Sequence, residues 1–323
     1  MKALFYSYPW AMDTPGGGER QLGAYQHHLH SCGMQADLFD MWRPNFADYQ
    51  IFHVFSVMPT LVEVCDYLKR RGLKIVVNPN LWITHETKGD YPFSGIWNIL
   101  ELADRVIVNS NMEGDALSDV FAMPRTKFHT VYNGAEAEFL IPADPAVFRK
   151  RFDIEGPYVL NVANVERRKN QLEFLRILRE ERPDLKLIIA GGSRDPQYAQ
   201  ECLQAGGDQV RIIGYLPYAS ELMRSAMSGC EFFAMPSLLE TPSIAAIEAA
   251  AIGAKVLLTE VGSTREYFGD SVTYVNPKAP ESIRAGIAAM ATATTEKSIW
   301  AARHRLLWPQ IAPEIINCYN QLF

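Results

Sequence analysis

The sequence predicts an α/β protein made of two doubly wound, Rossmann-like domains. Short apolar segments of strand length alternate with helix-length segments along the whole chain, which is typical of parallel sheets covered by helices. The alternation lapses between Asn133-Gly134 and Gly156-Pro157 and then restarts. A chain of 323 residues is also long enough to bury two separate cores.

In the first half of the chain, apolar segments predict strands, and the segments between them predict helices. The expected strands are residues 2–8, 35–39, 51–55, 74–77, 105–108 and 128–131. The expected helices are residues 19–31, 60–71 and 112–120, of which the second is ended by Gly72. The polar stretch 78–92 lacks either pattern and is long enough to predict a functional loop.

The second half repeats the same architecture. Its expected strands are residues 158–162, 186–190, 210–213, 231–234, 255–258 and 272–275. The stretch before them contains Pro142 and Pro145 and predicts a linker with a short charged helix. We therefore place the first domain at residues 1–153 and the second at 154–307. The last segment, 308–323, has apolar residues near helical spacing and predicts a helix that belongs to the second domain or crosses back to the first.

The composition indicates a soluble protein. Hydrophobic residues make up 48% and charged residues 21%, and the net charge of −6 argues against a broad nucleic-acid-binding surface. The five cysteines lack metal-ligand or redox spacing, which predicts reduced thiols in a cytoplasmic protein. We expect no signal peptide, and no apolar run approaches the ~18 residues that span a bilayer. The basic clusters 69–74 and 149–151 predict a peripheral contact with acidic lipid or an anionic acceptor, or else solvated helix ends.

Two glutamates eight positions apart, Glu240 and Glu248, form the most informative motif. The segment between them predicts a helix start, with Thr241 as the capping hydroxyl and Pro242 at the first helical position. The helix would run to Ile252, so Glu240 would lie at the mouth of a parallel sheet beside a helix N-terminus. Such a terminus attracts phosphate. A carboxylate that can accept from ribose hydroxyls, placed beside an anion-binding helix start, suits a nucleotide diphosphate.

Two further segments follow strands and have features of anion-binding loops. The segment 161–170, Asn-Val-Ala-Asn-Val-Glu-Arg-Arg-Lys-Asn, carries Lys169 and lies where open α/β sheets bind phosphate. The segment 15–20, Pro-Gly-Gly-Gly-Glu-Arg, contains consecutive glycines, whose backbone can approach a ligand closely. The alternative for Arg167 and Arg168 is a solvated helix start, and the alternative for the glycines is an ordinary loop.

These motifs together resemble the family 4 retaining glycosyltransferases of the GT-B fold, over most of the chain and most strongly from residue 158 to 275. The resemblance implies two Rossmann-like domains that face a central cleft. It also implies roles for the residues that match the family's motifs. Glu240 would contact the donor sugar and Glu248 the ribose; Lys169, Gly16, Gly17 and the amides of Ser243 and Ile244 would hold the phosphates; and Tyr215 would border the nucleobase, unless it is a packing residue.

The chain departs from the family pattern at two places. The family's phosphate-binding arginine is replaced by Asn164, and Arg168, one helical turn along, is our candidate to supply the missing charge. A histidine that many members carry after the fourth strand is replaced by Asn78 or Asn80, and His85 lies close enough in sequence to compensate. His53 resembles a strand-end histidine of the family, although a lone histidine on a strand is more often a core residue.

The resemblance implies a retaining glycosyltransferase that moves a hexose from a nucleotide-diphosphate sugar to an acceptor hydroxyl, in glycan or glycoconjugate synthesis. The acceptor would be a glycan, a lipid-linked sugar or a small molecule. No Asp-x-Asp pair occurs, so we expect no metal and no other cofactor. Two alternatives remain: a nucleotide-sugar or glycan binding protein that has lost transfer activity, and a nucleotide-sugar epimerase.

Overall fold

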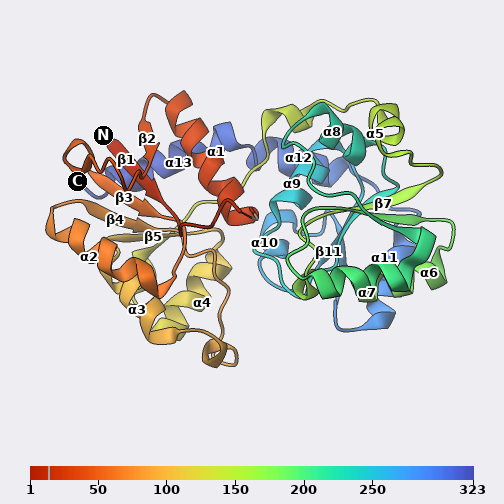
Figure 1. Ribbon diagram of the computed structural model, residues 1–323, viewed down its shortest axis with the longest axis horizontal. Coiled ribbons are helices and arrows are strands. Elements are labelled where there is room, and N and C mark those ends of the chain that lie inside the picture. Colours follow the sequence, from red (N-terminus) through yellow and green to blue (C-terminus); the bar gives the residue numbers. More distant parts are fainter. Residues whose placement is uncertain (14) are drawn as a thin grey trace. The chain divides into compact units, whose positions relative to one another are not determined.

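The computed structural model describes residues 1–13 and 15–323, and its chain divides into two compact units (Figure 1). The first unit comprises residues 1–133 together with 308–323, and the second comprises residues 134–307. Each unit is built on a parallel six-stranded sheet. The two sheets and their helices confirm the predicted α/β class with two Rossmann-like domains.

The sheet of the first unit has the strand order β2-β1-β3-β4-β5-β6. Its strands are β1 (Lys2–Tyr6), β2 (Gln35–Leu38), β3 (Ile51–Val54), β4 (Lys74–Val77), β5 (Arg105–Val108) and β6 (Phe128–Thr130). Its helices are α1 (Gly17–Ser31), α2 (Val62–Arg70), α3 (Phe93–Leu102), α4 (Asn111–Phe121) and α13 (Trp308–Asn320). Short 3₁₀ turns, η1 (Phe46–Asp48), η2 (Pro59–Leu61), η3 (Lys88–Asp90) and η4 (Arg125–Lys127), complete the connections.

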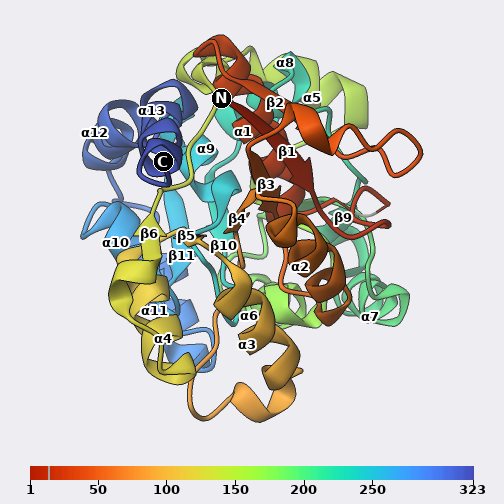
Figure 2. The same cartoon turned by 90° about the vertical axis from the view of Figure 1, so that its left-hand side faces the viewer.

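Both faces of this sheet are covered by helices. Figure 2 shows α2 and α3 on one face, and buried side chains of these helices and of α4 form one core with the sheet. Helices α1 and α13 pack against each other, and the rings of Tyr25 and Trp308 meet edge to face at 5.9 Å. The segment 308–323 therefore crosses back to the first unit, which is one of the two predicted placements.

The sheet of the second unit has the strand order β12-β11-β10-β7-β8-β9. Its strands are β7 (Tyr158–Val162), β8 (Lys186–Ala190), β9 (Val210–Ile212), β10 (Phe232–Met235), β11 (Val256–Thr259) and β12 (Thr273–Val275). Its helices are α5 (Pro145–Phe152), α6 (Gln171–Glu181), α7 (Pro196–Gly206), α8 (Glu221–Ser228), α9 (Ile244–Ile252), α10 (Thr264–Phe268), α11 (Pro280–Ala289) and α12 (Glu296–Arg305), with the turns η5 (Ala137–Leu140), η6 (Arg167–Lys169) and η7 (Gly207–Gln209). Helices α6, α7 and α11 share one core with the sheet.

Residues 134–153, which the sequence placed with the first domain, pack in the second unit. Helix α5 lies against α8, where the backbone N–H of Phe148 donates to Ser225 Oγ at 2.9 Å. The Phe148 ring also packs on Tyr158 of β7 at 5.5 Å. The predicted short charged helix is present as α5, and its buried Phe148 anchors the proline-containing stretch to the second core.

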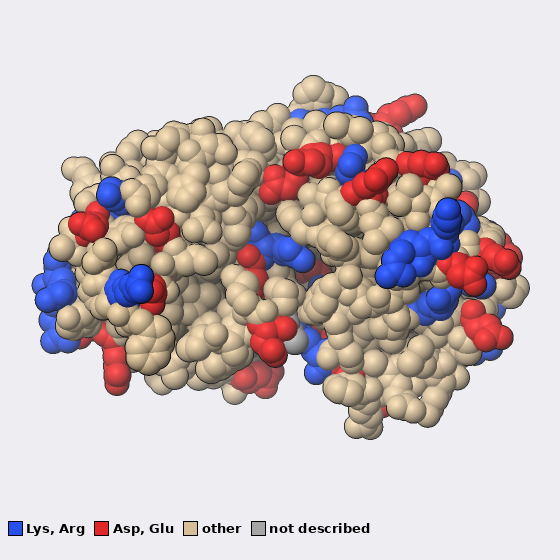
Figure 3. All heavy atoms as spheres, turned by 45° about the horizontal axis from the view of Figure 1, so that its top comes forward, with Lys and Arg blue, Asp and Glu red and all other residues tan. Residues whose placement is uncertain are grey.

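The surface is mixed in charge. Figure 3 shows Lys and Arg interspersed with Asp and Glu over the face that it presents. Within the basic cluster 69–74, Lys69 and Lys74 both lie near Asp104, and Arg70 pairs with Asp66 at 2.5 Å. These ion pairs favour the interpretation of the cluster as solvated helix ends. Within the described residues, we find no helix with both the length and the apolarity needed to cross a bilayer.

Candidate functional site

Glu240 lies in the loop that follows β10, and its backbone is tied to the turn at Gly262. The N–H of Glu240 donates to Val261 O at 3.2 Å, and the N–H of Ser263 donates to Glu240 O at 3.1 Å. Gly262 has a φ of +101°, and a Cβ at this position would lie 2.0 Å from Glu240 O. Glycine is therefore required at position 262 for the two loops to approach so closely. This contact holds the Glu240 backbone in place.

The Glu240 carboxylate forms a buried ion pair with Lys169 of η6. Lys169 Nζ lies 2.6 Å from Glu240 Oε1, and the two side chains are only 13% and 6% exposed. Burial would raise the pKa of Glu240, but the charges of Lys169 and Arg168 outweigh burial and hold that pKa below its ordinary value. Burial also lowers the pKa of Lys169, and Glu240 offsets part of that effect. The site therefore brings together the two residues that the sequence singled out from segments 71 positions apart.

Arg168 lies along the loop that carries Glu240. Its Nη1 donates to Leu239 O at 3.0 Å, and its own backbone O accepts from Leu238 N at 2.8 Å. Its Nη2 lies 2.9 Å from Glu166 Oε1. The predicted alternative, a solvated helix start, fits Arg167 instead, because that guanidinium is 56% exposed and pairs with Glu201 at 2.7 Å.

Helix α9 begins two residues later than predicted. Its N-cap is Ser243, whose Oγ accepts from Ala246 N at 3.3 Å, whereas Thr241 and Pro242 precede the helix and are joined by a cis peptide bond. Thr241 as N-cap was therefore wrong, and Ile244 is the first helical residue. Glu248 is 2% exposed in this helix, and the other residues from Ala246 to Ile252 are buried as well. Helical periodicity alone could not have shown its environment, because α9 has no polar face.

Asn164 and Tyr215 are brought together beside the loop after β8. The Tyr215 hydroxyl donates to Asn164 Oδ1 at 2.8 Å, and Gly192 N donates to the same oxygen at 3.2 Å. A Cβ at Gly192 would lie 2.4 Å from Tyr215 Oη, so a glycine is needed for the tyrosine to reach Asn164. Tyr215 nevertheless keeps 46% of its surface exposed. Asn164 therefore joins two loops at the end of the sheet.

In the first unit, the glycine segment and Asn80 lie together. Gly16 is the N-cap of α1 and Gly17 is its first residue, two positions before the predicted start, because the Glu19 carboxylate accepts from Gly16 N at 2.7 Å. A Cβ at Gly17 would meet no atom within 4 Å, whereas one at Gly18 would lie 3.2 Å from Asn80 Nδ2. The amide of Asn80 therefore rests against the first turn of α1.

A line of buried amides supports Asn80 from inside the first unit. Asn80 Oδ1 accepts from Asn109 Nδ2 at 2.8 Å, and Asn109 Oδ1 accepts from Gln21 Nε2 at 2.7 Å. The buried Glu113 carboxylate accepts from Asn109 N and Leu81 N, at 2.7 and 3.1 Å. Because Asn80 uses its oxygen internally, its Nδ2 is the atom directed toward the glycine turn.

The two candidate histidines lie elsewhere. His53 is fully buried, and its Nδ1 and Nε2 are bonded to Tyr319 Oη at 2.5 Å and Asn78 Oδ1 at 2.6 Å. Burial lowers the pKa of His53 to about 3. Both ring nitrogens are thus engaged, Nδ1 with α13 and Nε2 with the residue that follows β4, which matches the core interpretation and leaves neither to offer a sugar. His85 is exposed and pairs with Asp119 at 3.0 Å, so the structure does not place it beside Asn80.

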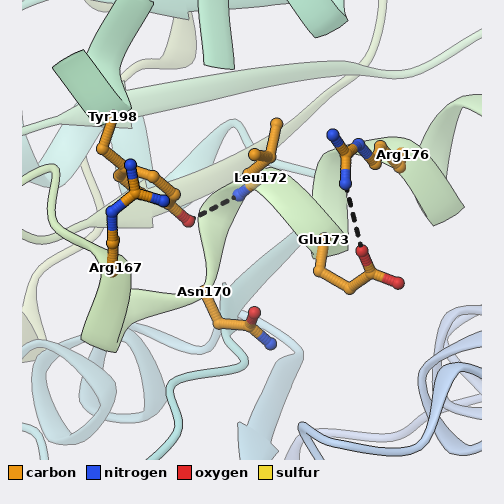
Figure 4. Close-up of a pocket in the computed structure, with 6 residues that line it drawn as sticks. All are labelled: Arg167, Asn170, Leu172, Glu173, Arg176 and Tyr198. Carbon is orange, nitrogen blue, oxygen red and sulfur yellow. Dashed lines mark hydrogen bonds and ion pairs between the residues drawn. The ribbon is translucent and has the colours of Figure 1, made fainter. Parts of the chain in front are cut away.

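A pocket of the second unit is lined by none of Arg168, Lys169 and Glu240. It has a volume of about 190 Å³ and is lined by Arg167, Asn170, Leu172, Glu173, Arg176 and Tyr198 (Figure 4). Both of its arginines are already paired with carboxylates, Arg167 with Glu201 and Arg176 with Glu173. In the part of the chain that the structure describes, no group of three His, Cys, Asp or Glu residues is arranged to hold a metal ion.

Several residues near the predicted positions were missed by sequence reasoning. Glu166 lies between Arg168 and Arg194, and a signal for Arg194 was present, because Gly191-Gly192-Ser193-Arg194 follows a strand just as the first glycine segment does. Ser237 is fully buried, and its hydroxyl contributes to the lowered pKa of Glu240. Asn109 had no such signal, since an asparagine after a strand is common in loops.

Two protein families match the chain. The family described as "Glycosyltransferase Family 4" matches residues 14–139, and the family described as "Glycosyl transferases group 1" matches residues 145–304. Among curated relatives, the alpha-maltose-1-phosphate synthase of Mycolicibacterium smegmatis is 27% identical over 207 residues, which are 59% of this chain and 53% of that protein. The D-inositol 3-phosphate glycosyltransferase of Mycobacterium sp. (strain JLS) is 28% identical over 187 residues, 55% of this chain and 42% of that protein. The chain thus spans about half the length of these curated relatives.

Solved structures share the fold over the whole chain. The sucrose-phosphate synthase of Thermosynechococcus elongatus superposes with a TM-score of 0.81 at 20% identity, covering 99% of this chain and 98% of that one. The Anabaena HepE protein in complex with UDP-glucose superposes with a TM-score of 0.82 at 16% identity, covering 99% and 100%. At these identities the likeness establishes the fold of both units.

Proposed function

The chain belongs to the family 4 glycosyltransferases of the GT-B fold, and from this premise we propose that it transfers a hexose from a nucleotide-diphosphate sugar to an acceptor hydroxyl, with retention at the anomeric carbon. The observation that carries the proposal is the buried Lys169–Glu240 ion pair, at 2.6 Å, in the loops that precede α6 and α9. It supplies a fixed cation for a departing diphosphate and a fixed carboxylate for the sugar. We propose glycan or glycoconjugate synthesis as its setting.

In the proposed reaction, the bond between the anomeric carbon and the diphosphate breaks while a bond to the acceptor oxygen forms on the same face. The acceptor proton passes to a phosphate oxygen of the leaving group, so no separate general base is required. Negative charge grows on the diphosphate, and Lys169, Arg168 and the amides of Ser243 and Ile244 would stabilise it. Fixed donors aimed at developing charge are usually the largest contribution to such catalysis. Glu240 would orient the sugar and offset its developing positive charge.

The remaining predicted residues take supporting roles in this proposal. Glu248 would bind the ribose and the exposed Tyr215 would border the nucleobase, while Asn164 holds Tyr215 in place. In the first unit, Gly16 and Gly17 would contact the donor phosphates, and the directed Nδ2 of Asn80 would contact the transferred sugar or the acceptor. We propose that the reaction needs no metal ion, because cationic side chains would stabilise the negative charge of the diphosphate. We therefore expect EDTA to leave the transfer activity unchanged.

The donor to try first is a UDP-sugar, since solved structures of HepE from Anabaena contain UDP-glucose and UDP. Ligand at ~100 times its Kd raises the free energy of unfolding by about 2.7 kcal/mol, so a panel of UDP, GDP, ADP and their sugars would identify the donor by thermal unfolding. Product analysis by NMR would then show whether an α-linked donor gives an α-linked product.

Glu240→Gln tests the assignment directly. This variant keeps the size of the side chain and removes its charge, and we expect transfer to fall by about 100-fold or more. Glu221→Gln, at an exposed position at the start of α8, is the control and should keep full activity. Full transfer by Glu240→Gln would remove Glu240 from the proposed mechanism.

Asn164 favours one alternative, a nucleotide-sugar binding protein without transfer activity, because its amide lies where the family pattern has a guanidinium. In that case the panel would give a thermal shift with unchanged ligand. An isomerised sugar would instead indicate an epimerase.

A further inference from the structure

The Asn164 side-chain amide forms hydrogen bonds within the protein, and it has no positive charge with which to bind a diphosphate. Its oxygen accepts from Tyr215 Oη and from Gly192 N, at 2.8 and 3.2 Å. The loop after β8, which contains Gly192, runs parallel to the loop that contains Asn164. Val165 pairs with Ser193, and Val165 N donates to Gly192 O at 2.8 Å. Asn164 therefore positions the loop after β8.

That loop carries Arg194 to the same carboxylate that Arg168 contacts. Arg194 Nη1 lies 3.8 Å from Glu166 Oε2, and Arg168 Nη2 lies 2.9 Å from Glu166 Oε1. Two guanidinium groups thus flank one carboxylate. Arg168 also donates a hydrogen bond to Leu239 O, and Leu239 directly precedes Glu240 of the Glu240–Lys169 ion pair.

This cluster has an excess of positive charge and is open to a ligand. Arg168, Lys169 and Arg194 face two carboxylates, Glu166 and Glu240. The side chains of Arg168 and Arg194 are 48% and 33% exposed, so part of each remains accessible. A guanidinium can offer two parallel N–H donors to phosphate oxygens, which an amide cannot replace.

We propose that Arg194, held in place through Asn164 and Glu166, binds the donor diphosphate together with Arg168 and supplies the guanidinium that position 164 lacks. The proposal rests on the function proposed above. It assigns Asn164 a positioning role and Arg194 a binding role, and it explains how the site keeps its charge with an asparagine at position 164.

Isothermal titration of the full chain with UDP, GDP and ADP, and with the matching nucleosides, tests this assignment. Arg194→Gln should weaken binding of the preferred diphosphate by about 10- to 100-fold, since charged hydrogen bonds are lost. Nucleoside binding should not change, because the nucleoside has no phosphate, and this also reports that the variant is folded. Arg167→Gln is the matched control, because Arg167 precedes Arg168 but pairs with Glu201 and stacks on Tyr198 at 5.2 Å.

The outcomes separate the two proposals. If the wild-type protein binds a diphosphate and Arg194→Gln binds it equally well, the role of Arg194 is refuted and the proposed function stands. If Arg167→Gln weakened diphosphate binding as much as Arg194→Gln, the role of Arg194 would also be refuted, because the loss of any nearby positive charge would then explain the effect. If the wild-type protein binds none of the three diphosphates, the proposed function is refuted, and the assignment of Arg194 with it.

Discussion

Asn80 of the first unit is held by neutral amides, whereas Lys169 and Glu240 of the second unit hold each other in an ion pair. In the first unit, Gln21, Asn109 and Asn80 form a line of hydrogen bonds between uncharged groups. In the second, the charged pair of Lys169 and Glu240 is buried. Amides fix the direction of a donor or acceptor, while buried charges provide a strong field. This difference fits the proposed function, in which the first unit would orient hydroxyl groups and the second would stabilise the negative charge of the leaving group.

Breaking the buried ion pair should have the largest effect. Lys169→Met keeps most of the side-chain volume but leaves the Glu240 carboxylate in a site that is almost closed to water. We expect the free energy of unfolding to fall by about 3–5 kcal/mol, measured by urea denaturation. The double variant Lys169→Met/Glu240→Gln should recover much of this loss, because no buried charge is left unpaired. A double variant no more stable than Lys169→Met would show that charge is not the cause.

The pH dependence of stability should differ between the units. The pKa of His53 is about 3 in the folded first unit, against about 6.5 when unfolded. Below pH 6.5 the unfolded chain binds a proton that folded His53 does not, so stability is lost as the pH falls from 6.5 toward 3. The loss at pH 5 is about 2 kcal/mol. The lowered pKa of Glu240 affects stability only at lower pH. Its contribution to the free energy of unfolding is fully present above the unfolded pKa of about 4.5 and is lost as the pH falls below that value.

Hydrogen exchange of peptides from each unit at pH 7 and pH 5, corrected for intrinsic rates, would resolve this difference. We expect destabilisation at pH 5 to be concentrated in the first unit and to be reduced in His53→Gln. Equal pH dependence in wild type and His53→Gln would contradict the explanation.

Removing one amide from the first unit should have a smaller effect on stability and a selective effect on activity. Asn109→Ala leaves Gln21 Nε2 and Asn80 Oδ1 without this partner and should cost about 1–2 kcal/mol. Because Asn80 would lose its orientation, transfer should fall while nucleotide binding is retained. Thermal unfolding with and without nucleotide, beside a transfer assay, would show both. The exposed Asn45→Ala is the control, and a parallel loss of nucleotide binding would count against a role limited to the first unit.

The order of the strands along the chain was readable from the sequence because it depends on local patterns, although helix α3 (Phe93–Leu102) was not among the predicted helices. Alternating apolar segments predicted both sheets, and α9 ends at Ile252 as predicted, followed by Gly253 with a φ of +99°. Helix starts were less certain, since Thr241 and Ser243 are both capping residues and sequence alone favoured the one followed by proline. Burial of Phe148 decided where residues 134–153 belong, and no local pattern encodes which core a phenylalanine enters.

The sequence by itself determined the fold class and the residue types that a diphosphate site needs, because strand periodicity, glycine and charge are properties of short segments. Only the tertiary structure decided which of these residues meet. It brought Lys169 to Glu240 and brought Arg194 and Arg168 to the same carboxylate, Glu166, while it buried His53 and turned His85 toward Asp119. The physical reason is that the contacts of Lys169 with Glu240 and of Arg194 with Glu166 join the ends of strands that are neighbours in a sheet but separate in the chain. Their partners are set by strand order, which segment-by-segment patterns do not specify.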